Sequence, residues 1–151
     1  MVNKITMNLL ILLAIPCILY GRSFNVMDFG ARGNGISDDA IAIQKAVDAC
    51  TNAGGGDVVF SANHVFLSGP VQLKSNVNIV LETNSVWKAN PDESIYHLSA
   101  FGKNEGEGMM WIWAKDVENL SFSGHGTIHG NGIKFMGAEL FDSYELKRVT
   151  T

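Results

Sequence analysis

Cysteine is scarce in this chain, which has only Cys17 and Cys50 among its 151 residues. Because Cys17 lies in a segment that has the pattern of a removable leader, Cys50 would remain alone and could form no internal disulfide. Cys50 also falls on the apolar side of a helical pattern. That position predicts a buried thiol rather than a nucleophile.

Long apolar runs are also few, and the longest one, Leu9–Ile15, lies close to the N-terminus. It follows the basic Lys4 and precedes the small residue Gly21, an order that is typical of a signal peptide. We therefore predict a signal peptide over residues 1–23 and an exported domain over residues 24–151. A membrane anchor is the alternative, but the run is short for a bilayer span. The expected location is secreted or periplasmic, with no membrane contact after cleavage.

Basic residues are outnumbered, because 11 Lys and Arg stand against 15 Asp and Glu and give a net charge of −4. Apart from Lys147-Arg148 the sequence has no basic cluster, so nucleic acid is not an expected partner. His125 and His129 are four residues apart, but in a glycine-rich segment rather than on a helix, which argues against a metal site. The glycines of Gly30–Gly35 reverse the dinucleotide-binding spacing. We therefore expect no cofactor and no metal.

What the chain contains in quantity is short apolar segments at close spacing, with Gly, Pro, Asn or Ser in the breaks. Most gaps are too short for helices between strands, and shorter than a hairpin sandwich usually needs. Such spacing favours a chain that coils and lays each strand beside the strand of the preceding turn. The predicted strands are Asp57–Phe60, Val65–Leu67, Val71–Leu73, Val77–Leu81, Val86–Trp87, Trp111–Ala114, Leu120–Phe122 and Thr127–Ile128.

One helix is predicted ahead of these strands, over Ala40–Ala53. Ile43, Val47 and Cys50 repeat at helical spacing and form a single apolar stripe. A stack of coiled strands exposes its core at both ends unless something covers it. We therefore expect this helix to cover the N-terminal end.

The segment before the helix is predicted to begin with a short strand over Phe24–Phe29 and to continue as a loop over Gly30–Gly35. Ser37 and Asp38 follow as candidate N-cap residues. Asp38 and Asp39 form an acidic pair that could be mistaken for catalytic carboxylates. Their place at a helix start favours capping and a favourable interaction with the helix dipole.

Four stretches of the mature sequence resemble the polygalacturonase-type glycoside hydrolases and their pectate-lyase-like β-helix relatives. Phe24–Asp39 looks like the opening motif of that family, and Ala40–Phe60 looks like its capping helix and first coil. Phe66–Asn78 is similar to the next coil, and Ser123–Gly132 to the glycine-rich coil. The resemblance implies an all-β protein, a right-handed parallel β-helix (solenoid) with an N-terminal amphipathic capping helix.

The same resemblance implies inverting hydrolysis of α-1,4-linked galacturonan in pectin, with carbohydrate metabolism as the setting. Inverting hydrolysis needs a carboxylic acid and a carboxylate about 6.5–9.5 Å apart. The family supplies them, with a Gly-His-Gly and an Arg-x-Lys, from an Asn-Thr-Asp motif and a later Asp pair, in coils beyond the glycine-rich one. This chain contains no Asn-Thr-Asp and no Arg-x-Lys.

We therefore expect the chain to be the N-terminal part of a polygalacturonase-like enzyme, truncated at its C-terminal end. It holds no assigned catalytic residues and would be inactive alone. Gly124-His125-Gly126 copies the catalytic tripeptide in the wrong context, so a structural role is predicted for it. Two alternatives stay open: a non-catalytic glycan-binding β-helix stub, and a rhamnogalacturonase or lyase-type relative.

Trp111 and Trp113 are the candidate substrate-binding residues. They fall on one face of a predicted strand, beside the long polar segment 90–108. Indole rings can stack on sugar rings, although large apolar side chains more often fill cores. The expected partner is a pectin-type polysaccharide.

Overall fold

The computed structural model describes residues 21–96 and 110–132, which form one α-helix and three parallel sheets. Residues 1–20 of the predicted signal peptide and 97–108 of the predicted long loop lie outside the described residues. The elements in chain order are β1 (Ser23–Asn25), the 3₁₀ helix η1 (Val26–Phe29), β2 (Asn34–Asp38), α1 (Ala40–Asn52), β3 (Gly56–Phe60), β4 (Val65–Ser68), β5 (Val71–Gln72), β6 (Val77–Leu81), β7 (Val86–Ala89), the 3₁₀ helix η2 (Glu93–Ile95), β8 (Ile112–Trp113), β9 (Ser121–Gly124) and β10 (Thr127–His129).

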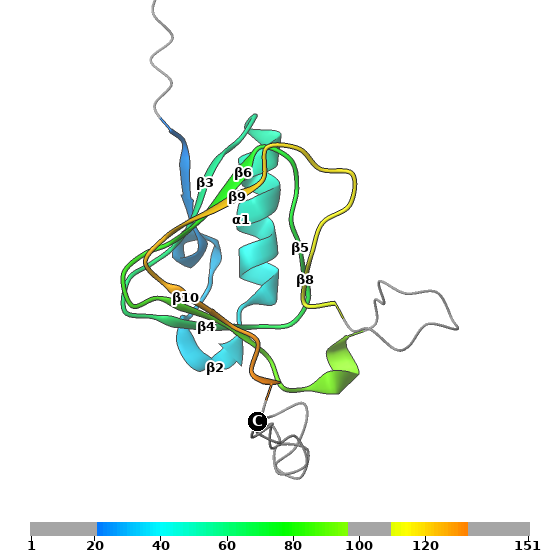
Figure 1. The fold of residues 1–151 in the computed structure, drawn as a ribbon. Coiled ribbons are helices and arrows are strands. Elements are labelled where there is room, and N and C mark those ends of the chain that lie inside the picture. Colours follow the sequence, from blue (N-terminus) through cyan, green and yellow to red (C-terminus); the bar gives the residue numbers. More distant parts are fainter. Residues whose placement is uncertain (1–20, 97–109, 133–151) are drawn as a thin grey trace, which may run out of the picture.

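The chain passes through the three sheets in turn and then returns to the first. The sheets have the strand orders β1-β3-β6-β9, β10-β7-β4-β2 and β5-β8, and every pair of neighbouring strands is parallel. Seen along the stack, the sheets form the sides of a triangle (Figure 1). Asp57 pairs with Asn78 and Asn78 pairs with Ser121, so each strand lies beside its counterpart of the preceding turn. This confirms the predicted strand arrangement.

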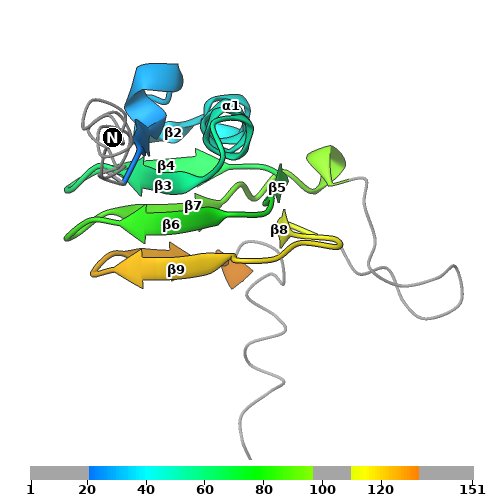
Figure 2. The same cartoon turned by 90° about the horizontal axis from the view of Figure 1, so that it is seen from above.

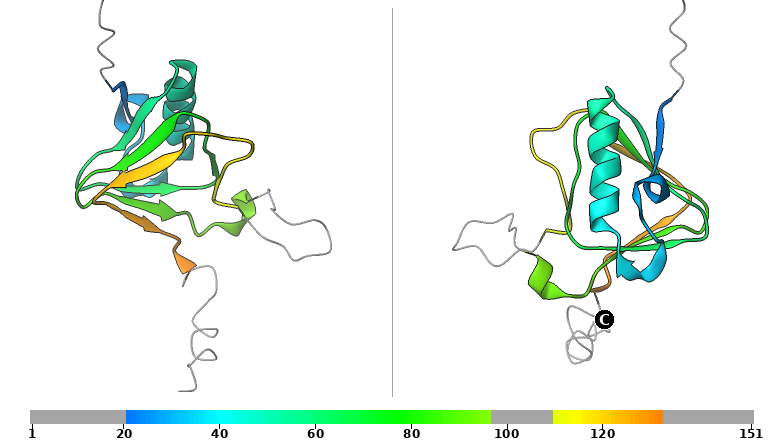
Figure 3. Two further views of the ribbon diagram at one scale, coloured as in Figure 1. Left: turned by 45° about the horizontal axis from the view of Figure 1, so that its top comes forward. Right: turned by 180° about the vertical axis from the view of Figure 1, so that it is seen from behind.

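The helix α1 lies across one end of the stack, next to the first turn of strands (Figure 2). Viewed from behind, it stands in front of the later turns of strands, with β1 and η1 beside it (Figure 3). Ile43, Val47 and Cys50 are fully buried in the same apolar cluster as Val58 and Phe60. The prediction that an apolar helical stripe covers the N-terminal end is therefore confirmed.

Two predictions about the segment before α1 are wrong. The first strand ends at Asn25, because the Asn25 side chain accepts a hydrogen bond from Met27 N at 3.0 Å and starts the 3₁₀ helix η1 instead. The loop predicted over Gly30–Gly35 is also too long, because β2 begins at Asn34. This strand pairs with β4. Parallel pairing uses backbone groups alone, so a polar stretch whose Ile36 is 82 % exposed can still form a strand.

The two aspartates at the helix start have different roles. Asp38 is the last residue of β2, and its Oδ1 accepts a hydrogen bond from Ala40 N at 2.8 Å. The N-cap position of α1 is Asp39, so the prediction of Ser37 or Asp38 as the N-cap residue is wrong. Asp39 makes no capping bond with its side chain. Its buried carboxylate accepts instead from Arg32 N at 2.7 Å and Gly33 N at 3.0 Å, so the capping prediction is wrong for Asp39.

Aromatic rings and asparagine turns align from one turn of the chain to the next. Phe60 and Trp87 lie with their centroids 4.8 Å apart in the interior. At the corners, Asn84 Nδ2 donates to Asn63 Oδ1 at 3.2 Å. All the paired corner asparagines have positive φ, a conformation that Asn tolerates better than most residues.

The last described turn is more exposed than the turns before it. Phe122 is 47 % exposed and Ile128 is 45 % exposed, whereas their partners in the preceding turn, Ile79 and Trp87, are fully buried. Among the described strands, β9 pairs only with β6 and β10 only with β7. The two ends of the stack therefore differ, since α1 covers one and the last turn presents apolar side chains at the other.

Candidate functional site

The predicted substrate-binding residues lie on or beside β8, and Trp111 is tied to the interior. Its Nε1 donates to Ser68 Oγ at 3.1 Å, and its ring meets Trp87 edge to face at a centroid distance of 5.6 Å. Trp113 is half-buried and pairs with Gln72 between β8 and β5. The structure therefore brings Trp111 against the core and leaves both tryptophans partly exposed.

The segment leading into that loop is anchored by Asp38. Its Oδ2 accepts from Gly69 N at 3.0 Å and from Asn90 Nδ2 at 2.7 Å. Tyr96, just before the loop, donates from its hydroxyl to Asn90 O at 2.7 Å. Burial, followed by the nearby negative charge of Asp38, raises the pKa of Tyr96 to about 12. Asp38 thus links the start of α1, the β4–β5 corner and the start of the loop.

The Gly-His-Gly tripeptide is a tight corner between β9 and β10. His125 N and Gly126 N both donate to Leu81 O, at 2.8 and 3.0 Å. Gly124 has φ +99°, and a Cβ there would overlap the Leu81 carbonyl. A Cβ at Gly126 would overlap the Ser85 hydroxyl. Both glycines are required by this close approach, which confirms the structural role predicted for the tripeptide.

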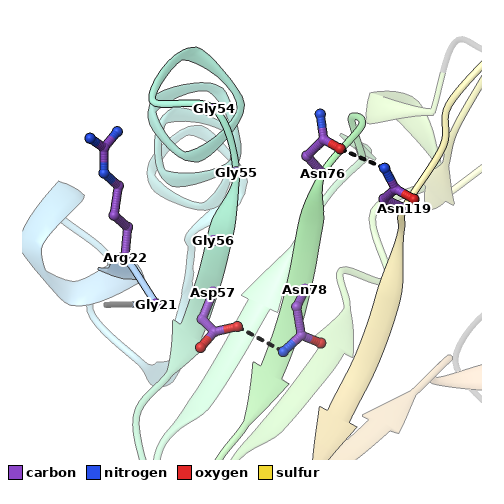
Figure 4. Close-up of a pocket in the computed structure, with 9 residues that line it drawn as sticks. All are labelled: Gly21, Arg22, Gly54, Gly55, Gly56, Asp57, Asn76, Asn78 and Asn119. Carbon is purple, nitrogen blue, oxygen red and sulfur yellow. Dashed lines mark hydrogen bonds between the residues drawn. The ribbon is translucent and has the colours of Figure 1, made fainter. Parts of the chain in front are cut away.

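A groove of about 370 Å³ lies on the outer face of the β1-β3-β6-β9 sheet, near the starts of its strands. Figure 4 shows Asp57 on β3 and Asn78 on β6 pointing toward one another, and Asn78 Nδ2 donates to Asp57 Oδ1 at 2.8 Å. Asn119 Nδ2 donates to Asn76 Oδ1 at 2.8 Å at the adjoining corner. The groove is lined by Gly21, Arg22, Gly54, Gly55, Gly56, Asp57, Asn76, Asn78 and Asn119.

The polar row of this groove continues onto the next strand. Ser121 Oγ and Ser123 Oγ both donate to Asn78 Oδ1, at 2.9 and 3.2 Å. Arg22 stands at the opposite side and donates to Ala53 O. Within residues 21–96 and 110–132, neither Arg22 nor Asp57 forms a salt bridge; the ion pair found there joins Lys74 to Asp48 at 2.7 Å.

A second hollow, of about 380 Å³, lies on the same sheet at the ends of its strands. Glu82 and His125 line it, and Glu82 Oε2 accepts a hydrogen bond from Ala62 N at 2.8 Å. One carboxylate and one imidazole do not make the two-carboxyl arrangement that inverting glycoside hydrolysis uses. This hollow therefore carries no assignment as a hydrolytic centre.

The remaining titratable groups with shifted pKa values have structural explanations. Burial, and then the charge of Asp57, raises the pKa of Cys50, which lies fully buried as predicted. Burial alone would raise the pKa of Asp48, but hydrogen bonds from Lys74 and Gln44 outweigh it and lower that pKa. No group of three metal-ligating side chains occurs in the described part of the chain. No helix in that same part is both long and apolar enough to cross a membrane.

The Asp57–Asn78–Ser121 row was not predicted from the sequence. These residues are 21 and 43 positions apart, and only the strand register brings them together. A signal was present, because each is the polar neighbour of an apolar residue in an alternating strand pattern. The alternation places each of the three on the outer face of its strand, but the pairing itself depends on the register between turns of unequal length.

Comparison with known proteins places these features in a family. Residues 23–138 match the family model described as rhamnogalacturonase A/epimerase, pectate lyase-like. The chain is 31% identical over 113 residues to a polygalacturonase from Malus domestica, covering 74% of this chain and 22% of that protein. It is also 48% identical over 64 residues to mannuronan C5-epimerase AlgE2 from Azotobacter vinelandii, covering 38% of this chain and 6% of the epimerase.

Among solved structures, the chain is similar to a hyperthermoactive exopolygalacturonase from Thermotoga maritima. The TM-score is 0.62 at 33% sequence identity, over 72% of this chain and 25% of that chain. This chain therefore spans a quarter or less of the length of each of these three relatives.

Proposed function

Because the chain belongs to the rhamnogalacturonase A/epimerase, pectate lyase-like family, we propose that it forms the first coils of a right-handed parallel β-helix in a polygalacturonase-like glycoside hydrolase. The observation that carries the proposal is the family match over residues 23–138, which coincides with the parallel, turn-by-turn pairing of the described strands. Polygalacturonases are among the relatives in both sequence and structure. The proposed substrate is the galacturonan of pectin.

In this proposal the chain supports the coils that follow it and contacts the sugar polymer. It does not supply the catalytic acid and base. Inverting hydrolysis of an α-1,4 linkage needs two carboxyl groups on opposite sides of the glycosidic bond. Those groups would come from coils of the whole protein outside this sequence. The α1 end of the stack is closed, while Phe122 and Ile128 offer an apolar end on which further coils can pack.

Trp111 and Trp113 are proposed to contact the sugar chain from the β8 side. Trp111 is oriented by its hydrogen bond to Ser68, and such a fixed ring makes a better stacking platform than a mobile one. The protein is proposed to be exported by a signal peptide over residues 1–23. Secretion would bring it to its polymeric substrate outside the cell.

A lyase-type or epimerase-type relative is the second candidate. The family description names epimerases beside rhamnogalacturonase, and the mannuronan epimerase is 48% identical over 64 residues. A hydrolase releases a saturated reducing end from the polymer. A lyase leaves an unsaturated uronide, and an epimerase changes the polymer without cutting it.

A product analysis on polygalacturonate separates the hydrolase outcome from the lyase outcome. The 151-residue chain and the protein encoded by the complete reading frame are incubated with the polymer, and reducing ends and unsaturated uronides are measured. We expect saturated reducing ends from the complete protein and none from the 151-residue chain. Hydrolysis by the 151-residue chain alone would contradict the supporting role. Unsaturated product would favour the lyase-type alternative.

A further inference from the structure

A row of polar side chains begins in the groove on the β1-β3-β6-β9 sheet and continues across the strands. Asp57, Asn78 and Ser121 occupy paired positions on three neighbouring strands. Their chain neighbours Val58 and Ile79 are fully buried, and since side chains alternate along a strand, the polar members face outward. Neighbouring strands are about 4.8 Å apart, so the row offers one polar side chain at each such step, with Asp57 and Asn78 inside the groove and Ser121 beyond it.

The row is preorganised, yet it keeps hydrogen-bonding capacity. Asp57 uses Oδ1 to hold Asn78, and Asp57 Oδ2 has no partner among the residues that the structure describes. The Ser121 and Ser123 hydroxyls donate to Asn78 and remain able to accept. Side chains that are already fixed lose little conformational entropy when a ligand binds. The backbone of Gly54–Gly56 forms one wall of the groove and carries no side chain that would obstruct a ligand.

The charge of the groove selects the ligand. Two charged groups of opposite sign, Arg22 and Asp57, line it, so the groove has no excess positive charge to hold the carboxylates of a galacturonan chain. Sugar hydroxyls both donate and accept, and they match a row made of a carboxylate, an amide and hydroxyls. The Arg22 side chain is engaged with Ala53 O, so the groups with free hydrogen-bonding capacity are those of Asp57, Ser121 and Ser123.

We propose that this groove is a second carbohydrate-binding site, which takes a neutral, hydroxyl-rich stretch of a polysaccharide running across the strands. The strand spacing is close to the length of one hexose unit in a 1,4-linked chain, so consecutive units would meet consecutive polar side chains. The site lies on a different sheet from Trp111 and Trp113 and prefers a different sugar chemistry. It would hold the enzyme on neutral polymer while hydrolysis proceeds elsewhere.

The test measures binding of the full 151-residue chain to two soluble neutral glycans, a 1,4-linked galactan and a 1,4-linked glucan, with polygalacturonate as the acidic comparison. Asp57→Asn is nearly isosteric and keeps an acceptor for Asn78, so it removes mainly the charge. We expect it to weaken neutral-glycan binding about tenfold. The matched control is Asp116→Asn, the same substitution at an exposed aspartate outside the groove, which is expected to leave affinity unchanged.

Ser121→Ala provides a second variant, because Ser121 is exposed and its replacement does not threaten the fold. A weakening of about threefold is expected from the loss of one neutral hydrogen bond. The proposal is overturned if neither neutral glycan binds, if Asp57→Asn and Ser121→Ala bind as the unchanged chain does, or if Asp57→Asn binds neutral glycan more tightly. Product analysis on polygalacturonate is independent of these results, so failure here leaves the hydrolase assignment to its own test.

Discussion

The indole rings of Trp87 and Trp111 meet edge to face, with their planes 66° apart, and both donate a hydrogen bond to the same buried hydroxyl. That acceptor is Ser68 Oγ, at 2.7 Å from Trp87 Nε1 and 3.1 Å from Trp111 Nε1. The two tryptophans stand on either side of the long segment between β7 and β8. Ser68 therefore holds the two tryptophans that flank this segment in the sequence, and one of them, Trp111, is a proposed sugar contact.

Ser68→Ala is therefore expected to destabilise the protein. It removes the acceptor of two indole N–H groups, and an unsatisfied buried donor costs about 1–3 kcal/mol. We expect the free energy of unfolding, measured by urea denaturation, to fall by about 2–3 kcal/mol.

Ser85→Ala is the matched control for that substitution. Ser85 is equally buried, but its hydroxyl has no hydrogen-bond partner among the described residues. Its loss should change the free energy of unfolding by less than about 0.5 kcal/mol. An equal loss in the free energy of unfolding for Ser68→Ala and Ser85→Ala would contradict a stabilising role of Ser68 as the shared acceptor.

Gly124→Ala should be more damaging than its surface position suggests. Gly124 has φ +99°, and a Cβ there would overlap the Leu81 carbonyl that accepts from His125 and Gly126. We expect a loss of more than about 2 kcal/mol, read from thermal unfolding followed by circular dichroism. Gly130→Ala is the control, because nothing lies within 4 Å of a Cβ at that site. A Gly124→Ala variant as stable as Gly130→Ala would contradict the tight-corner geometry.

The titration of Tyr96 should separate the folded state from the unfolded state. Its pKa is about 12 in the folded protein because of burial and the charge of Asp38, against an ordinary value of 10.0. The protonated Tyr96 hydroxyl therefore contributes to the free energy of unfolding. This contribution is fully present below the pKa of Tyr96 in the unfolded state, and it is lost as the pH rises toward the pKa of Tyr96 in the folded state. Spectrophotometric titration between pH of about 9 and 12 should show a late-ionising tyrosine that is missing in Tyr96→Phe. Ionisation of all tyrosines near 10 in the folded protein would refute this environment.

Cys50 should be unreactive until the protein unfolds. Its side chain is fully buried, and burial raises its pKa, so little thiolate is available at neutral pH. In a Cys17→Ser background, we expect a thiol-specific disulfide reagent to label Cys50 at least about 100-fold more slowly in the folded chain than in urea. Equal labelling rates in the two states would place Cys50 outside the core.

Much of the fold could be predicted from the alternation of apolar residues. Val77–Leu81 has the bounds that its alternating pattern predicted, and α1 ends within one residue of its predicted end. The pattern failed where backbone groups or local side-chain bonds decide the structure. β2 is a polar strand held by parallel pairing, and the Asn25 side chain turns the chain into a 3₁₀ helix after three strand residues.

The site was less predictable than the fold, for a physical reason. The Asp57–Asn78 hydrogen bond joins residues 21 positions apart, and nothing local in either strand indicates the other. Asp39 likewise looked like a helix cap, but its carboxylate satisfies the amides of Arg32 and Gly33 in the preceding loop. Polar contacts between successive turns depend on register, which local sequence periodicity does not encode.

The most direct test of the proposed function is the anomeric configuration of the first product. The protein encoded by the complete reading frame is mixed with an oligogalacturonate, and the newly formed reducing end is followed by proton NMR before mutarotation. Inverting hydrolysis of an α-1,4 linkage predicts that the β-anomer appears first. An α-anomer appearing first, or an unsaturated uronide in place of a reducing sugar, would contradict the proposed reaction.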